Sequence, residues 1–156
     1  MTRIALYRGT SFESRVIRWV TRSVYSHAAF LLADGSVIEA WANGVQHSPN
    51  ISSLHSPGTR VDVFRFTDPL DAQKGAGLVE LLMTDIGRPY DYKDVFRFIT
   101  RRAGNPNGRV FCSELVAQRC KDVGRPLFRD TEPWRVPPDW IARTIALAPD
   151  GTLVTI

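Results

Sequence analysis

Cysteine is scarce in this chain of 156 residues, which has only Cys112 and Cys120. Both fall in the stretch FCSELVAQRC, within a predicted helix over 112–122. Eight helical residues at a rise of 1.5 Å separate two Cα atoms by about 12 Å, whereas a disulfide needs less than about 7 Å. The sequence therefore excludes an intrachain disulfide and predicts two free thiols, which is typical of a reducing compartment.

Long apolar runs and dense charged runs are absent as well. No stretch reaches the roughly 20 apolar residues that cross a bilayer, and the opening MTRIALYRGT lacks the apolar core of a secretory leader. We therefore expect a cytoplasmic protein by default, with a phage-encoded protein or one delivered by a secretion system as alternatives. The net charge of +4 comes without a nucleic-acid motif. No nucleic-acid partner is predicted, while contact with an anionic membrane surface or a cell wall stays open.

Metal ligands at a characteristic spacing are also lacking. No pair of histidine, cysteine or acidic residues has the short separation that marks a structural or catalytic metal site along a chain. The sequence therefore predicts neither a metal site nor a cofactor.

The pattern of apolar residues predicts an α+β protein with one domain over 1–156 and a small antiparallel sheet packed against helices. Alternation predicts strands at 3–8 and 60–66 and a hairpin in HAAFLLADGSVIEAW. Helical periodicity predicts helices in five segments: 11–24 (with Thr10 and Glu13 at capping-box spacing), 70–86, DYKDVFRFIT, 112–122 and PPDWIARTIAL. A turn and a final strand are expected at PDGTLVTI.

The two cysteines occupy opposite ends of their predicted helix. Cys112 lies in the first turn, where the partial positive charge of the helix stabilises a thiolate and free N–H groups can bind an oxyanion. Cys120 lies near the other end, where that charge is negative, and a small packing role fits it. Cys112 is therefore the candidate nucleophile, and an inert buried thiol is its alternative.

A nucleophilic cysteine needs a base, and the chain has three histidines. His47 and His55 lie in QHSPNISSLHSPG, where we expect solvated loop residues. His27 precedes the apolar run AAFLL, and Glu39 interrupts the apolar run VIEAW. A carboxylate there is costly without a partner, so Glu39 is the candidate that orients His27.

The turn between the two runs decides whether these side chains meet. A two-residue loop, Asp34-Gly35, pairs Phe30 with Glu39 and sends His27 to the opposite face. A three-residue loop over 33–35, with Gly35 left-handed, pairs Ala29 with Glu39 and puts both candidates on one face. If His27 is functional, the longer loop is predicted.

The chain contains four segments in this order: IRWVTRSVYSHAAF, VIEAW followed by GV, GRPYD and FCSELVA. Together they resemble the permuted NlpC-type papain-like cysteine hydrolases (the YiiX-like group), which are related to lecithin:retinol acyltransferase-like proteins. The resemblance that they carry covers roughly residues 3–123. The resemblance implies a circularly permuted papain-like fold in which the histidine strand precedes the cysteine helix. It also implies roles: Cys112 as nucleophile, His27 as base, Glu39 as the orienting residue and Tyr90 as an aid to the oxyanion. Tyr92 is a rival for that last role, and a turn tyrosine packed on the core is the alternative for Tyr90.

These residues predict a cysteine-dependent hydrolase that cuts amide bonds, either peptide or isopeptide, through a thioester. Peptidoglycan is one candidate substrate. A lipid-directed thioesterase, phospholipase or acyltransferase is the alternative, with an acyl lipid as substrate. Four basic residues before Cys112 would support this alternative if they face an anionic head group. Otherwise they form a solvated helix face. They are Arg97, Arg101, Arg102 and Arg109. A non-catalytic binding module is the third reading. The oligomeric state cannot be read from the sequence.

Overall fold

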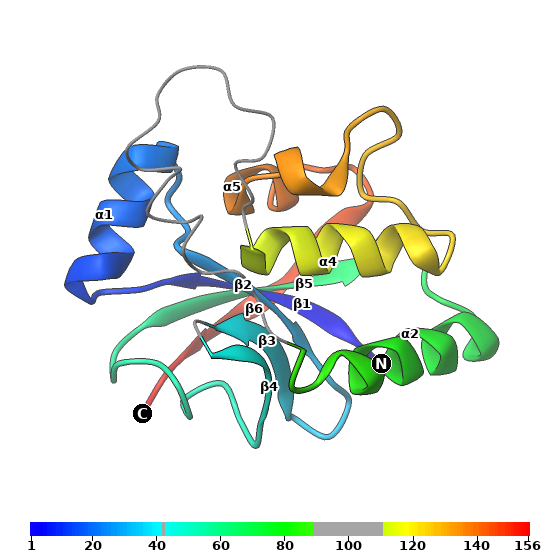
Figure 1. Ribbon diagram of the computed structural model, residues 1–156, viewed down its shortest axis with the longest axis horizontal. Coiled ribbons are helices and arrows are strands. Elements are labelled where there is room, and N and C mark those ends of the chain that lie inside the picture. The colour runs from blue at the N-terminus through cyan, green and yellow to red at the C-terminus, as the bar shows by residue number, and fades with distance from the viewer. Residues whose placement is uncertain (42, 89–110) are drawn as a thin grey trace.

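The computed structural model describes residues 1–41, 43–88 and 111–156 (Figure 1). Its centre is a six-stranded sheet with the order β4-β3-β2-β1-β5-β6, and every neighbouring pair is antiparallel. The strands are β1 (Arg3–Arg8), β2 (His27–Leu31), β3 (Val37–Trp41), β4 (Gly44–Ser48), β5 (Arg60–Phe66) and β6 (Leu147–Val154). The described helices are α1 (Phe12–Thr21), α2 (Ala72–Asp85), α4 (Phe111–Asp122) and α5 (Pro138–Ile141), with a 3₁₀ turn, η1, at Pro133–Arg135. This is the predicted α+β class with an antiparallel sheet.

The sheet buries both of its faces. Alternate residues of β1, such as Ile4 and Leu6, join the apolar core formed with α2, α4 and α5. The residues that alternate with them along the strand, Ala5 and Tyr7, belong to a second cluster on the opposite face. Ile51 packs against this cluster. Figure 1 shows α4 lying across the sheet with α5 beyond it. The central strands are therefore covered on both sides, which is why β2 is apolar at almost every position.

Several predicted elements are confirmed, namely the strands at 3–8 and 60–66, the hairpin, and the helices at 70–86 and 112–122. The first helix is shorter than predicted. Its N-cap is Ser11 rather than Thr10, with the Ser11 side chain accepting from the N–H of Ser14. It ends at Thr21 because Arg22 adopts a left-handed conformation, with φ of 52°.

Two predictions, the loop that follows the hairpin and the length of the last helix, differ from the structure. Residues 46–48, predicted to start a polar loop, are part of β4 (Gly44–Ser48) on the edge of the sheet. The last helix covers only four residues. The Thr144 hydroxyl donates to the carbonyl of Leu127, and from Leu147 the chain pairs with β5 instead of continuing a helix. The predicted helix in DYKDVFRFIT lies outside the described residues.

Both cysteines are free, as predicted. Among the described residues, no helix combines the length and the apolar character that crossing a membrane requires.

Candidate active site

The hairpin between β2 and β3 has the register that the three-residue loop requires. Ala29 pairs with Glu39, and Gly35 adopts a φ of 89°. The Leu32 N–H donates to the carbonyl of Ser36 at 2.8 Å, which closes the loop over 33–35. The longer loop is therefore confirmed, and His27 and Glu39 share one face of the sheet.

His27 and Glu39 meet directly. The distance from His27 Nε2 to Glu39 Oε2 is 2.9 Å, and the Glu39 side chain is fully buried. The hydroxyl of Ser48, on the neighbouring β4, donates to the other carboxylate oxygen, Oε1, at 3.0 Å. Glu39 thus has partners on both oxygens, which offsets the cost of burying its charge.

His55 is a third partner of this carboxylate, and the prediction that it is solvated is wrong. Its Nε2 lies 2.9 Å from Glu39 Oε2, the oxygen that also bonds His27. Its side chain is only 6 % exposed and stacks on the ring of Tyr7, with centroids 3.7 Å apart. The segment between β4 and β5 folds back over the sheet, which a polar composition does not reveal. His47 is exposed as expected, although it lies in β4 rather than in a loop.

These bonds keep Glu39 ionised. Burial by itself would raise the pKa of its carboxyl group, but the hydrogen bonds and charges of His27 and His55 outweigh that effect. The pKa of Glu39 therefore lies well below its usual range.

Cys112 lies in the first turn of α4, half-buried, and is hydrogen-bonded to His27. Burial would raise the pKa of its thiol, but the charge and hydrogen bond of His27 lower it, helped by the backbone N–H groups of Ala28 and Ser113. The net effect places the pKa of Cys112 below its usual value. Because Glu39 occupies Nε2 of His27, the other ring nitrogen, Nδ1, remains for the thiol.

The pKa of His27 shifts in the opposite direction to that of Cys112. Burial would lower its pKa, but the neighbouring Cys112 thiolate and Glu39 carboxylate raise the pKa of the imidazole above its usual value. The pair therefore favours a thiolate beside an imidazolium. Cys120 differs, because complete burial and Asp122 raise the pKa of its thiol far above the ordinary range. It serves as a packing residue of the core.

Aromatic rings enclose the histidine. The ring of His27 lies 5.5 Å from Tyr7 and 5.0 Å from Trp41, measured between centroids. In the sequence, both residues are indistinguishable from ordinary strand aromatics, so nothing pointed to this contact. Water is largely excluded here, so the charged pair interacts more strongly than it would in solvent.

The start of α4 is anchored from behind. Ser113 is fully buried, and its hydroxyl donates to the carbonyl of Val136 at 2.6 Å. Further along α4, Arg119 makes two hydrogen bonds of 2.6 and 2.7 Å to Asp85 of α2. These contacts fix the helix, and with it Cys112, against the sheet.

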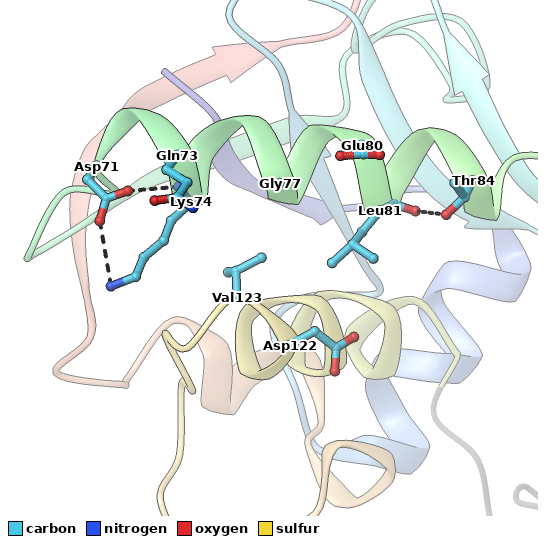
Figure 2. Close-up of a pocket in the computed structure, with 9 residues that line it drawn as sticks. All are labelled: Asp71, Gln73, Lys74, Gly77, Glu80, Leu81, Thr84, Asp122 and Val123. Carbon is cyan, nitrogen blue, oxygen red and sulfur yellow. Dashed lines mark hydrogen bonds and ion pairs between the residues drawn. The ribbon is translucent and has the colours of Figure 1, made fainter.

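A surface hollow between α2 and the end of α4 is separate from this site. Figure 2 shows it lined by Lys74 and Leu81 of α2 and by Asp122 and Val123 at the far end of α4. Ten helical residues, or about 15 Å, separate Asp122 from Cys112. The hollow therefore contains none of the candidate residues.

The other predicted candidates lie outside the described residues. These are Tyr90 and its rival Tyr92, together with the basic set Arg97, Arg101, Arg102 and Arg109. Their predicted roles stay predictions. Among the described residues, one group could hold a metal ion. His27, Glu39 and His55 have ligand atoms that all lie within 4.8 Å of one another.

An antiparallel sheet with a helix-start cysteine against a strand-start histidine, the histidine coming first in the chain, defines a permuted papain-like fold. The family model of the permuted papain-like amidases (YaeF/YiiX, C92 family) matches residues 8–126. The chain therefore belongs to this family, whose members are hydrolases of amide bonds.

One solved structure supports the fold. The crystal structure described as that of metalloprotein yiiX from Escherichia coli O157:H7 is similar with a TM-score of 0.67. The match has 18 % sequence identity and covers 96 % of this chain and 94 % of that chain. At this identity it establishes the shared fold alone. No curated protein sequence matches the chain.

Proposed function

We propose that the protein hydrolyses amide bonds, peptide or isopeptide, with Cys112 as nucleophile, His27 as base and Glu39 as the orienting residue. The observation that carries this proposal is the continuous hydrogen-bonded chain from the Cys112 thiol through the His27 ring to the buried Glu39 carboxylate. A nucleophile, a base and a third group that orients the base are the components of such triads.

The reaction has two halves. The Cys112 thiolate attacks the carbonyl carbon, and the resulting oxyanion is held by backbone N–H groups at the start of α4. His27, as imidazolium, gives its Nδ1 proton to the leaving amine as the C–N bond breaks, which leaves a thioester. The now neutral His27 takes a proton from water, hydroxide attacks the thioester, and the acid product leaves as the thiolate and imidazolium are restored.

Glu39 contributes by position and charge. It fixes the proton of His27 on Nε2, so that Nδ1 faces the thiol, and it stabilises the imidazolium. Tyr90 is kept as a candidate second donor to the oxyanion. Peptidoglycan peptides are the natural first substrates to try, since they carry both peptide and isopeptide bonds.

The matched pair Cys112→Ala and Cys120→Ala tests the proposal. We expect wild type and Cys120→Ala to be alkylated at Cys112 by iodoacetamide near pH 6, stoichiometrically, and to release new amines from muropeptides. Cys112→Ala should do neither.

Other outcomes separate the competing functions. Slow and equal alkylation of both cysteines, with no turnover, would favour a non-catalytic binding module. Cleavage of phospholipid vesicles that depends on Cys112, with muropeptides left intact, would favour the lipid-directed alternative over amide hydrolysis.

A further inference from the structure

The buried second histidine on Glu39 has no role in the thioester reaction. A carboxylate that orients a base needs one histidine, yet His27 and His55 both place Nε2 at 2.9 Å from the same oxygen, Glu39 Oε2. His55 is as sheltered as a core residue, with its side chain 6 % exposed. Its hydrogen bond helps to keep Glu39 ionised, and it also brings a second imidazole nitrogen to the oxygen that bonds His27, as a shared metal ion would require.

We propose that His27, Glu39 and His55 form a binding site for one Zn²⁺ ion. Two imidazole nitrogens and one carboxylate oxygen make up a donor set that zinc accepts, with a fourth position left for water. The nitrogens select zinc and similar transition ions over Ca²⁺ and Mg²⁺, which take oxygen ligands.

The geometry needs little adjustment. Tetrahedral zinc with bonds of about 2.0–2.1 Å separates its ligand atoms by about 3.3 Å. Each observed nitrogen-to-oxygen distance is 2.9 Å, and all three ligand atoms lie within 4.8 Å of one another. Each of the two nitrogen-to-oxygen contacts therefore has to open by only about 0.4 Å. The two ring nitrogens, which lie within 4.8 Å of each other, have to come to about 3.3 Å, and rotations of the rings bring them together.

The surroundings hold the ligands in place. Ser48 donates to Oε1 of Glu39 and leaves Oε2 directed at the two rings. Tyr7 stacks on His55 at 3.7 Å and contacts His27 edge-on. Partners of this kind, which orient ligands without touching the ion, are a regular part of zinc sites.

The three ligands come from separate parts of the chain, two strands and the segment after β4. Because they are separated by twelve and sixteen residues, no short metal-ligand spacing marks them along the chain. Cys112 is not part of the group, because it faces the opposite side of the His27 ring.

Zinc and the amidase reaction exclude each other. A zinc ion on Nε2 of His27 displaces the proton that Glu39 holds there, so the remaining ring proton must sit on Nδ1. A zinc-bound imidazole cannot become an imidazolium, so it cannot pass a proton to the leaving amine and then accept one from water. Bound zinc would thus act as a reversible inhibitor. This consequence rests on the proposed function, whereas the binding itself does not.

The test measures binding directly, with Zn²⁺ in equilibrium dialysis and Co²⁺ as a coloured substitute, on chelator-treated protein. We compare wild type with His55→Phe, which keeps a ring to stack on Tyr7, and with His47→Phe as the matched control at an exposed histidine. Cys112→Ser is the fourth protein, and circular dichroism checks that each is folded. Wild type, His47→Phe and Cys112→Ser should bind one ion per chain, while His55→Phe binds at least about 10-fold more weakly.

The cobalt spectrum identifies the ligands. We expect the visible bands of tetrahedral Co²⁺ without the sulfur-to-metal band of a thiolate ligand. Loss of binding in Cys112→Ser, or a thiolate band, would assign the ion to the cysteine–histidine pair and overturn the proposal. Unchanged binding in His55→Phe, or no binding by wild type, would do the same.

A replacement variant and an activity measurement complete the test. If His55→Phe fails to fold, Glu39→Gln takes its place, and it should also weaken binding at least about 10-fold. If zinc binds as described but no amide substrate is ever cleaved, the proposed function fails while the site stands. If amide turnover is found, added zinc should abolish it and a chelator should restore it.

Discussion

Replacing Asp62 tests how the sheet supports the segment that leads into His27. Asp62 lies on β5, is only 7 % exposed, and gathers four side chains around its carboxylate. Arg8 and Arg60 donate at 2.9 and 3.0 Å, and the hydroxyls of Tyr25 and Thr152 donate at 2.8 Å each. Tyr25 stands two residues before His27, so this cluster ties the entry of β2 to β1, β5 and β6.

The pKa of Asp62 gives the magnitude. Burial would raise it, but the hydrogen bonds from Thr152, Tyr25 and the two arginines lower it from 3.8 to about 2. The lowering of the pKa from 3.8 to about 2, at about 1.4 kcal/mol per pKa unit, corresponds to about 2 kcal/mol of stability. Because the folded-state pKa is depressed, this stabilisation is fully present above the unfolded-state pKa of 3.8. It is lost as the pH falls through about 2.

We therefore expect Asp62→Asn to reduce the free energy of unfolding by about 2 kcal/mol at pH 7. Its melting temperature should fall by about 4–8 °C. The difference from wild type should shrink to about half by pH 3, because the wild-type carboxylate then gives up its advantage. Urea denaturation at pH 7, 5, 4 and 3, followed by circular dichroism, measures both quantities.

Asp150→Asn is the matched control, since Asp150 is exposed and its ion pairs with Arg3 and Arg65 are long, at 3.5 and 3.7 Å. That change should cost under about 0.5 kcal/mol. A loss of less than about 0.5 kcal/mol in Asp62→Asn, or a loss that does not change with pH, would refute the reasoning.

Three further substitutions test, by urea denaturation, how glycines and a buried hydroxyl support the fold. Gly44→Ala should cost about 2 kcal/mol, because Gly44 has a φ of 112° and an added Cβ would lie 2.7 Å from the carbonyl oxygen of Arg88. Gly75 lies in α2, and a Cβ added there would have no atom within 4 Å. Gly75→Ala should therefore raise the free energy of unfolding by about 0.5–1 kcal/mol. Stability changes of the same sign in both variants would contradict this. Ser113→Ala should cost about 1–3 kcal/mol, because the buried carbonyl of Val136 loses its donor. Unchanged stability would show that another group satisfies that carbonyl.

The register of the hairpin was predicted on the condition that His27 is functional. The sequence Ala33-Asp34-Gly35 is compatible with a two-residue loop at Asp34-Gly35 and with a three-residue loop that has a left-handed glycine. Only the three-residue loop places Glu39 beside His27, because a slip of one residue moves every side chain of a strand to the other face of the sheet. The cost of burying an unpaired carboxylate, rather than the turn sequence alone, therefore selected the register.

The role of His55 could not be predicted, because its position depends on how a long polar segment folds back. Nothing in QHSPNISSLHSPG alternates clearly, so the sequence predicts a loop where residues 46–48 belong to β4. The strand forms because the edge of β3 has free hydrogen-bonding groups, with which it pairs. Ser48 then contacts Glu39 from β4, and His55 contacts it from the segment that follows β4. Tertiary pairing decided a segment whose local preference was weak.

The burial of Glu39 nevertheless predicts more than one hydrogen-bond partner for its carboxylate. It lies in a strand that is buried along almost its whole length, so both carboxylate oxygens must be satisfied within the protein. An ionised carboxylate offers about four acceptor sites, and a single histidine N–H fills one of them. His27 alone therefore left acceptor sites unfilled, and the missing donors had to come from nearby polar residues. Ser48 and His55 are those donors.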